Sequence, residues 1–391
     1  MCFRFGRFCL CMDLAQRRSL FPVCQDHIYF NHAAVSPIAT PTRQAMEAAL
    51  AEQNESGSVA WQRWIAALDR TRASLARLIG ASVEEIGFTK NTSAGLGLVA
   101  QGLDWRRGDR VVTFVCEFPA NLYPWLALRD RGVEVDLLPE AALADLDQIR
   151  CACRGARLLS ISFVQYLSGF RADVEAIGQI CHETGTLLMV DAIQGLGAFP
   201  LNVKQCKIHF LAADGHKWLT GPEGAGFAFV DESVLDQLTP REIGWLSVAN
   251  WEDFTAAAQA SAVAGSLMWQ AGARRFECGT YNTAGLIGLG TAVDLLLEIG
   301  VEATAQHILD LGDKLRSGLK FYKCHIAGEN YGLAHRSGIT SFRHPTFSAE
   351  ELVSRLLGDK IVCAARNGHV RIAPHLYNAP AEIAKFLECL A

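Results

Sequence analysis

The chain has 391 residues, of which 50% are hydrophobic and 20% are charged, a composition typical of a globular protein. A formal net charge of −5 and the lack of a basic stripe argue against nucleic acids or anionic membranes as partners. The longest apolar stretches have the length of strands or lie on amphipathic helices, so no membrane-spanning helix is predicted.

The 13 cysteines are scattered along the chain, and no two form a C-x-x-C pair. Because the spacing of zinc and iron–sulfur ligands is missing, we predict no metal site. The odd number of cysteines and the lack of a secretory signal predict reduced thiols and a cytoplasmic protein. Residues 1–11 are aromatic and basic, and we expect them to form a poorly packed, disordered extension.

An amphipathic helix is predicted over residues 45–78, because Trp61, Ile65, Leu68 and Leu75 fall on one side at the helical period. Strands and helices then alternate along the chain. The predicted strands are 86–88, 110–116, 133–138, 158–163, 186–190 and 208–212, and the predicted helices between them are 93–102, 121–131 and 174–184. Apolar strands that alternate with helices predict an α/β fold, with a mainly parallel sheet covered on both faces.

The pattern changes near Gly279. Two predicted helices, 283–298 and 302–319, precede short predicted strands at 325–327, 338–342, 361–365 and 369–372. A chain of this length is expected to have a second hydrophobic core. We therefore predict a large domain over 36–279 and a smaller α+β domain over 280–391. Residues 1–35 are expected to complete the small domain and line the entrance to the site.

The most informative residues follow two of the predicted strands. Asp191 and Gln194 come after strand 186–190, and Lys217 follows strand 208–212. Open α/β sheets bind their ligands at the carboxyl ends of such strands. Pyridoxal 5′-phosphate (PLP) needs a lysine amine that condenses with its aldehyde and a carboxylate that keeps its pyridine nitrogen protonated. This pair of residues therefore predicts a PLP site.

With Asp191, Gln194, His216 and Lys217 in this order, the chain resembles the class V aminotransferase family of fold-type I PLP-dependent enzymes. That family contains cysteine desulfurases, cysteine and cystine lyases and isopenicillin N epimerase-like proteins. The likeness covers nearly the whole chain, from Tyr29 to Asn378. It implies a seven-stranded, mainly parallel sheet in the large domain and a smaller α+β C-terminal domain.

The resemblance implies that Lys217 forms the aldimine with the cofactor and then removes the substrate α-proton, which gives a quinonoid. Asp191 would pair with the pyridinium nitrogen, and Gln194 would hydrogen-bond the phenolic oxygen of the cofactor. His216 stands beside the lysine, where a direct cofactor contact and a packed histidine both fit the family.

The phosphate is expected at Asn91, Thr92 and Ser93. These residues follow a strand and open a helix, whose free N–H groups suit an anion. The resemblance supports this assignment. Thr280 lies in a segment like the family's RFE-x-GT motif, whose threonine reaches the phosphate of the neighbouring subunit. This implies a homodimer with shared active sites.

Two further residues are assigned by the resemblance to the cofactor and the substrate. Phe118 corresponds to the aromatic residue that stacks on the cofactor ring. Arg371 matches the arginine that grips the substrate α-carboxylate, a task that suits a bidentate guanidinium. Asn31, His32 and Ala33 should line the same entrance, with a capping or packing role as the alternative for His32.

Three positions depart from the family pattern. Cys363 is the nearest cysteine before Arg371, but it lies in an apolar, strand-like run, whereas desulfurases carry a nucleophilic cysteine on a mobile loop. Asp214 replaces a serine that touches phosphate in many relatives, and we expect its carboxylate to turn toward a backbone N–H or a cation. Tyr166 replaces an asparagine, so its hydroxyl either contacts the phenolic oxygen of the cofactor or shapes the substrate pocket.

We therefore predict a PLP-dependent enzyme whose partner is a small amino-acid substrate. Aminotransferase or C–S lyase chemistry is favoured, because the loop cysteine is missing and a phenyl ring at Phe118 cannot shuttle protons. Cysteine desulfurase and amino-acid epimerase are the alternatives. A non-catalytic PLP-fold binding protein is the alternative from a different class.

Overall fold

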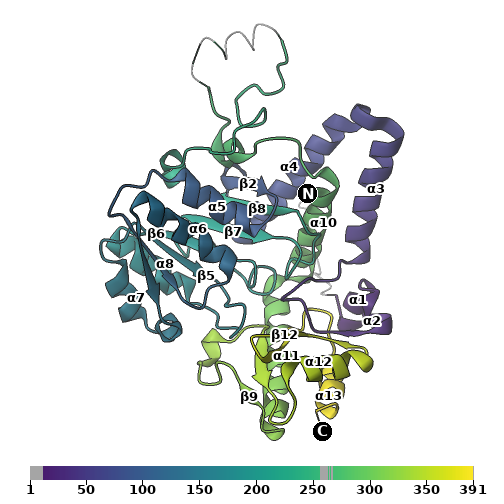
Figure 1. Ribbon diagram of the computed structural model, residues 1–391. Coiled ribbons are helices and arrows are strands. Elements are labelled where there is room, and N and C mark those ends of the chain that lie inside the picture. Colours follow the sequence, from purple (N-terminus) through teal and green to yellow (C-terminus); the bar gives the residue numbers. More distant parts are fainter. Residues whose placement is uncertain (1–11, 256–262, 264, 266, 391) are drawn as a thin grey trace, which may run out of the picture.

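The computed structural model describes residues 12–255, 263, 265 and 267–390 (Figure 1). The expectation for residues 1–11 lies outside this part of the chain. A seven-stranded sheet forms the centre of the larger unit, and a four-stranded sheet with its own helices forms the smaller one below it in this view.

The strands of the large sheet lie in the order β2-β8-β7-β6-β5-β3-β4. The neighbours from β4 to β7 are parallel, and β8 is antiparallel to both β7 and β2. The predicted α/β fold with a mainly parallel sheet is therefore confirmed. The strands are β2 (Ile86–Thr89), β3 (Arg110–Phe114), β4 (Glu134–Leu138), β5 (Leu158–Ser162), β6 (Leu187–Asp191), β7 (Phe210–Asp214) and β8 (Gly226–Val230).

Successive residues of the central strands belong to two hydrophobic cores on opposite faces of the sheet. Val112 and Leu159 join one core, whereas Val111 and Leu158 join the other. A strand that is buried on both faces reads as a continuous apolar run, which is why these strands show no alternation in the sequence. The first core includes α4 (Trp61–Ile79), α7 (Leu146–Cys153), α8 (Val174–Thr184) and α10 (Thr283–Ile299); the second includes α5 (Thr92–Gly102) and α6 (Tyr123–Leu126).

Two of the predicted helices are broken in the structure. The helix predicted over 45–78 is split into α3 (Thr40–Ser56) and α4, because Gly57 has a φ of 50° that an α-helix does not allow. The helix predicted over 121–131 consists of short turns around α6, and Pro119 and Pro124 each stand in the first turn of a separate short helix. The short 3-10 helices of the chain are η1 (Gly57–Ala60), η2 (Val83–Glu85), η3 (Pro119–Asn121), η4 (Ala127–Arg131), η5 (Glu140–Ala144), η6 (Glu232–Gln237), η7 (Gly272–Phe276) and η8 (Leu333–His335).

The smaller sheet has one apolar face and one polar face. Phe342, Val370 and Ile372 pack into a separate core with the helices that cover one side. The residues between them, Ser341 and Arg371, point to the other side. The elements of this unit are β9 (His325–Ile326), β10 (Thr340–Arg343), β12 (Ala364–Arg366), β13 (His369–Ile372), α11 (Val301–Phe321), α12 (Ala349–Gly358) and α13 (Pro380–Glu388).

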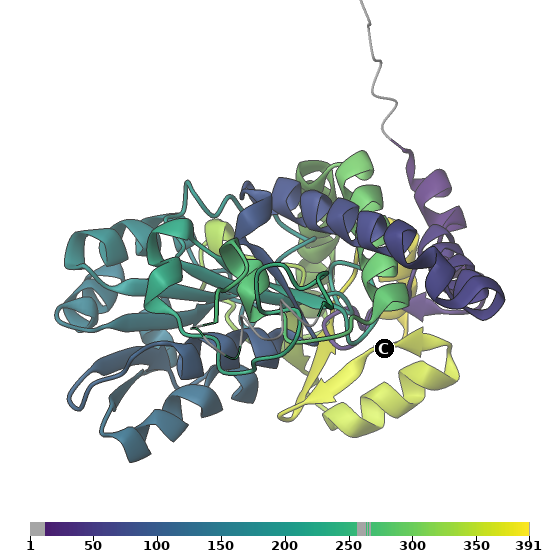
Figure 2. The ribbon, with the colours of Figure 1, turned by 90° about the horizontal axis from the view of Figure 1, so that it is seen from above.

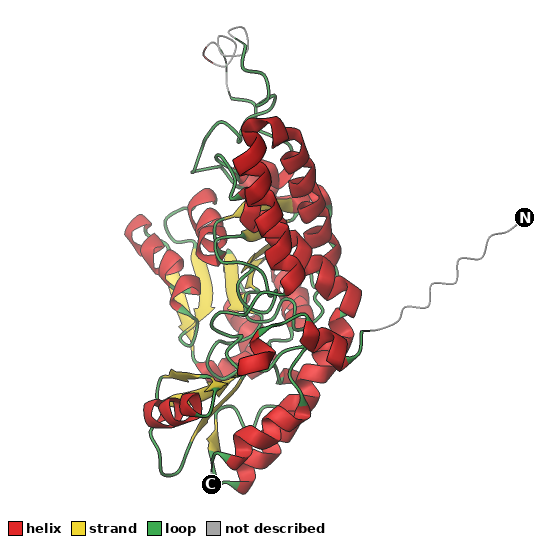
Figure 3. Ribbon diagram, turned by 90° about the vertical axis from the view of Figure 1, so that its right-hand side faces the viewer, coloured by secondary structure: helices red, strands yellow, loops and turns green. Residues whose placement is uncertain are grey.

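The N-terminal segment lies against the C-terminal elements, as Figure 2 shows. Strand β1 (Ile28–Tyr29) pairs in parallel with β11 (Ile361–Val362). Helices α1 (Leu14–Ser19) and α2 (Val23–Asp26) precede this strand. The long helices α3, α4 and α10 pack together beside the large sheet (Figure 3). The predicted domain limits stay predictions, although the packing of α10 favours placing this helix with the large unit.

In the described part of the chain, one bent pair of helices has the length and composition of a membrane span. Among the described residues, no single helix is long and apolar enough to cross a membrane. Helices α10 and α11 pass that test together, by length and composition only, and they are bent by 78° where they meet.

A buried ion pair fastens the segment before α10 to the large unit. The Arg72 guanidinium of α4 donates to both carboxylate oxygens of Glu277, over 2.7 and 3.2 Å. Glu277 also accepts hydrogen bonds from the Phe88 amide at 2.7 Å and from the Tyr281 hydroxyl at 2.6 Å. Helix α4, strand β2 and the chain on both sides of Glu277 therefore meet at one carboxylate.

We predict that Arg72→Met lowers the free energy of unfolding by about 3–5 kcal/mol, because it leaves the buried Glu277 charge unpaired. Arg43→Met removes one partner of the exposed Arg43–Glu47 pair and should cost less than about 0.5 kcal/mol. Urea unfolding followed by circular dichroism measures both changes. Equal losses in the two variants would contradict the assigned role.

Candidate active site

The carboxyl ends of β6 and β7 bring the predicted catalytic residues together. Asp191 is the last residue of β6, and it lies beside Ala212 of the parallel strand β7. Lys217 follows the end of β7 in a turn in which the Thr220 amide donates to the Lys217 carbonyl at 3.0 Å. The predicted acid and lysine therefore emerge at the same edge of the sheet.

Lys217 and Asp191 shift one another's ionisation. Burial lowers the pKa of the Lys217 amine to about 8, against the opposing influence of the Asp191 and Asp214 carboxylates. The positive charges of Arg371 and Arg366 lower this pKa as well. Burial raises the pKa of Asp191 to about 7, while the Lys217 charge pulls it down. A lysine with a pKa near 8 has a substantial fraction of nucleophilic free amine near neutral pH.

A second buried carboxyl, Glu117, was missed by the sequence reasoning. It accepts hydrogen bonds from the Ser162 amide and from the Gln165 side chain, both at 2.8 Å, and from the Ser162 hydroxyl. Burial raises its pKa, and its charge raises the pKa of Asp191. The available signal was an acidic residue just after an apolar strand and next to Phe118.

The predicted ring partner, Phe118, lies next to the lysine. The Nζ atom of Lys217 is 5.7 Å from the centre of the Phe118 ring. Phe118 is 45% exposed. Tyr166 packs edge-on against it, with ring centres 5.3 Å apart. The Tyr166 hydroxyl lies 3.4 Å from the Asn367 side chain, which favours the pocket-shaping role among the two alternatives for this residue.

Arg371 is buried without an acidic partner. Its Nη1 donates to the Tyr166 carbonyl at 2.8 Å, whereas its buried Nε has no hydrogen-bond partner. Ion pairs within the described chain do not include Arg371. A buried guanidinium with unused donors is costly, and a substrate carboxylate would satisfy it.

Gln194 is held from both ends of its amide. Its Nε2 donates to the Ala33 carbonyl at 3.0 Å, and its Oε1 accepts from the Trp218 indole at 2.9 Å. These bonds fix the side chain and leave one amide hydrogen for the predicted bond to the cofactor.

Asp214 and His216 pair with each other. One Asp214 oxygen accepts from the Gly215 amide at 2.7 Å, and the other lies 2.9 Å from Nδ1 of His216. The Asp214 carboxylate therefore turns toward a backbone N–H and an imidazole, as expected. His216 precedes Lys217 in the chain, and both alternatives for it, a direct cofactor contact and a packed histidine, stay predictions.

Asn31, His32 and Ala33, which were predicted to line the entrance, make different contacts. Asn31 forms a parallel bridge to Ala373, and the Ala33 carbonyl is taken by Gln194. His32 is fully buried; its Nδ1 donates to the Ala373 carbonyl at 2.7 Å and its Nε2 lies 2.6 Å from the Tyr377 hydroxyl. With both ring nitrogens occupied, the structure favours the packing alternative for His32 over a substrate contact.

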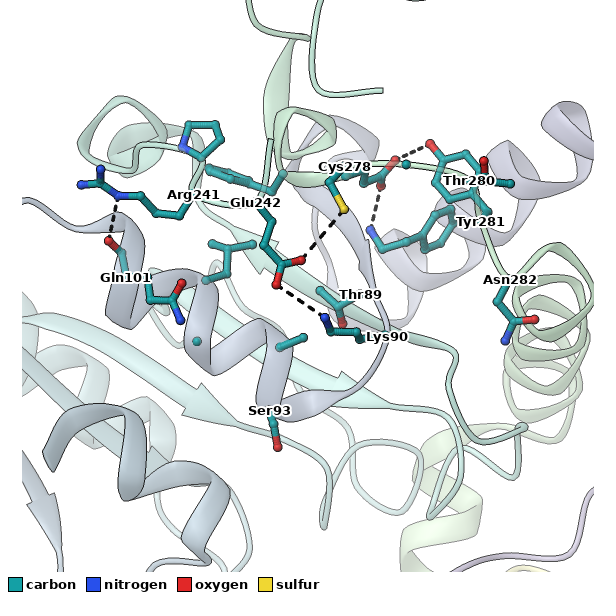
Figure 4. A pocket seen from close by; sticks show the side chains of 18 of the residues that line it. Thr89, Lys90, Ser93, Gln101, Arg241, Glu242, Cys278, Thr280, Tyr281 and Asn282 are labelled. Carbon is teal, nitrogen blue, oxygen red and sulfur yellow. Dashed lines mark hydrogen bonds and ion pairs between the residues drawn. The ribbon is translucent and has the colours of Figure 1, made fainter. Parts of the chain in front are cut away.

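The predicted phosphate residues open helix α5. Asn91 caps the helix by accepting from the Ala94 amide at 2.9 Å. The Thr92 hydroxyl is buried and lacks a hydrogen-bond partner, so an acceptor is missing at this helix start. Ser93 and Thr280 line a different cavity of about 380 Å³, which is drawn in Figure 4.

The cavity of Ser93 and Thr280 does not include Lys217 in its wall. Its rim carries the Lys90–Glu242 ion pair, 3.5 Å long, and Cys278, whose sulfur lies 3.9 Å from Glu242 (Figure 4). Within one chain, Lys217, Asp191, Phe118, Tyr166 and Arg371 are therefore brought together, and Thr280 is not placed with them. Among the described residues, no cluster of three or more His, Cys, Asp or Glu could hold a metal ion.

The profile of the Aminotransferase class-V family matches residues 28–381. The chain belongs to this family. The probable cysteine desulfurase of Methanothermobacter thermautotrophicus is 31% identical over 397 residues and covers 93% of both chains. The uncharacterized aminotransferase YcbU of Bacillus subtilis is 28% identical over 380 residues, with 96% of this chain and 97% of the relative covered.

Solved structures give the same result. The apo structure of a cysteine desulfurase from Thermococcus onnurineus NA1 matches with a TM-score of 0.85 at 28% identity, over 95% of both chains. A C-DES variant with glycine covalently linked to its PLP cofactor matches at 24% identity with a TM-score of 0.87, over 95% of this chain and 98% of that chain. The solved structures show the fold-type I architecture, and membership of the class V family makes this chain a PLP-dependent enzyme.

The site has the donors that PLP needs. Thr92 has a buried hydroxyl without a partner at the helix start where a phosphate would lie, and the buried Asp191 and the half-buried Lys217 lie at the neighbouring strand ends. Phe118 offers a partly exposed aromatic ring, and Gln194 an amide fixed by two hydrogen bonds. These residues would hold the cofactor, and the unsatisfied Arg371 would hold the carboxylate of the substrate.

We predict that the apoprotein captures PLP covalently faster as the pH rises, with a midpoint near pH 8, because only the unprotonated Lys217 amine reacts. Asp191→Asn removes a charge that raises the pKa of Lys217, so the midpoint should move to lower pH. Stopped-flow absorbance at a series of pH values measures the rate.

Lys217→Ala serves as the control, since borohydride should fix no cofactor to that chain. A midpoint near the ordinary lysine value of 10.5, or a move to higher pH in Asp191→Asn, would contradict the assignment.

Proposed function

We propose that this enzyme cleaves the C–S bond of cysteine or an S-substituted cysteine by β-elimination. The observation that carries the proposal is that, among the described residues, the cysteine nearest before Arg371 in the chain is not reactive. Cys363 is buried next to β12, and burial raises its pKa to about 12. Such a thiol is neither ionised nor free to move to a substrate.

The names of relatives support sulfur amino acids as substrates, since several are called cysteine desulfurases. Bound PLP would supply an electron sink for the carbanion at Cα. Arg371 would hold the α-carboxylate and the Phe118 face would fix the plane of the ring. The remaining task is to move one proton, and the buried Lys217 amine is the base placed for it.

The atoms balance without a redox partner. Lys217 takes the α-proton, the Cβ–S bond breaks with its electron pair on sulfur, and hydrolysis of the remaining fragment gives pyruvate and ammonia. A desulfurase instead transfers sulfur to a cysteine thiolate and releases alanine. That reaction is the second candidate, favoured by the names of the relatives.

We predict that the holoenzyme converts cysteine to pyruvate, ammonia and sulfide in equal amounts. Lys217→Ala should lower kcat/KM by about 10²–10⁴-fold, because the base is lost. Cys363→Ser should keep most of the activity. Coupled pyruvate detection and amino-acid analysis measure the products. Alanine as the main product, together with loss of activity in Cys363→Ser or Cys278→Ser, would establish the desulfurase instead.

We also propose a homodimer in which each site receives Thr280 from the partner. Two observations support it. Thr280 does not share a cavity with Lys217 of its own chain. The described residues before Thr280 expose large apolar side chains, including Ile243, Phe254 and Met268. Exposed apolar groups in such number indicate a protein contact.

Mixed dimers test the sharing of sites. A heterodimer of one Lys217→Ala chain and one Thr280→Ala chain should contain one site with both native residues, and that site should bind PLP with wild-type affinity. Fluorescence titration of purified, differently tagged heterodimers measures this. If Thr280 acts on its own chain, the one remaining lysine site would show the weaker affinity of the Thr280→Ala homodimer.

A cytoplasmic location remains part of the proposal. The cysteines of the described chain are free thiols, which suits a reducing compartment.

A further inference from the structure

The β12–β13 hairpin carries a second arginine on the same face as Arg371. Ala364 lies opposite Arg371 in the antiparallel register, and Arg366 lies opposite His369. Side chains two residues apart on a strand share a face, so Arg366 is the diagonal neighbour of Arg371, roughly 7–8 Å away along the sheet. Ala364, opposite Arg371, and His369, opposite Arg366, complete this face of the hairpin.

The hairpin turn next to Arg366 lies against Tyr166. Asn367 and Gly368 have φ angles of 48° and 71°, the backbone of a tight two-residue turn. Asn367 reaches the Tyr166 hydroxyl at 3.4 Å, and Arg371 holds the Tyr166 carbonyl. Both ends of the hairpin therefore contact one residue, which itself packs against Phe118.

Arg366 is exposed and makes no ion pair within the described chain. One of its N–H groups donates to the Ala365 carbonyl at 2.8 Å, which leaves most of its five donors free. Its charge is felt at both Lys217 and Arg371. Two cations on one face, the buried Arg371 and the exposed Arg366, form a pattern that matches two anionic groups on one molecule.

We infer that Arg366 binds a second carboxylate of the substrate, carried by the group on sulfur. The substrate class is then a sulfur amino acid whose leaving group is itself acidic. This inference rests on the proposed C–S cleavage for its sulfur atom, but the two-carboxylate recognition stands on the arginine geometry alone. Arg366 would set specificity through binding and take no part in proton transfer.

Binding of unreactive acids separates the two claims. Adipate has two carboxylates and hexanoate has one on a chain of equal length, so titration calorimetry of the holoenzyme compares them directly. Adipate should bind about fivefold more tightly, the upper range for an exposed ion pair, and Arg366→Ala should abolish the difference. Arg371→Ala should weaken both acids.

Arg355→Ala is the matched control, because it removes an exposed arginine from α12, which covers the opposite face of the same sheet. It should leave the preference for adipate unchanged. Arg366→Lys keeps the charge and should retain part of the preference.

Steady-state kinetics test whether Arg366 binds the second carboxylate of a reacting substrate. Arg366→Ala should raise KM for S-carboxymethylcysteine about fivefold with kcat unchanged, and should leave S-ethylcysteine unaffected. Equal weakening of adipate and hexanoate in Arg366→Ala, or no preference in the wild type, would overturn the inference. Retained preference for adipate with no C–S cleavage would instead refute the proposed reaction and leave the second carboxylate site standing.

Discussion

Burial of several ionisable groups at one edge of the large sheet constrains the chemistry of this enzyme. Asp191 and Glu117 are both buried carboxyls, and the burial of Asp191 and the charge of Glu117 both raise the pKa of Asp191. Lys217 in turn is easier to deprotonate because it is buried near Arg371. The negative and positive charges of these groups therefore partly cancel. A bound cofactor and the carboxylate of a substrate would add the charges that pair with Lys217 and Arg371. Replacing one of these ionisable residues changes the protonation of the others. The effects of single substitutions on activity are therefore not expected to be additive.

The scaffold holds this edge from two sides. On one side, the Arg72–Glu277 pair ties α4 and β2 to the chain that leads to Thr280. On the other side, the polar face of the small sheet docks on the large unit, where Ser341 bonds the Leu167 carbonyl and Arg371 bonds the Tyr166 carbonyl. Because that face presents donors to a backbone loop, the small unit positions its arginines and shapes the pocket through the same contacts.

The sequence was sufficient to locate the strands that end at Asp191 and near Lys217, because buried parallel strands leave uninterrupted apolar runs. It was less informative where the outcome depends on distant partners. Nothing local distinguishes His32 as a packed residue, since its two partners lie more than 300 positions away. Glu117 likewise acquires its role from Ser162 and Gln165 on another strand and its loop. The break at Gly57 depends on a single φ angle that a helical period over 45–78 conceals.

The short turn before Arg371 bears both on the absence of a nucleophilic cysteine there and on the substrate that the site would select. Between Arg366 and His369 the chain has two residues, which close the hairpin and leave no loop that could carry a thiol to the site. The same short turn places Asn367, the neighbour of Arg366, against the Tyr166 hydroxyl. An extended connection would provide mobility for sulfur transfer but would loosen the position of this arginine. The tight turn therefore favours recognition of the leaving group over capture of its sulfur, which is consistent with elimination as the proposed reaction.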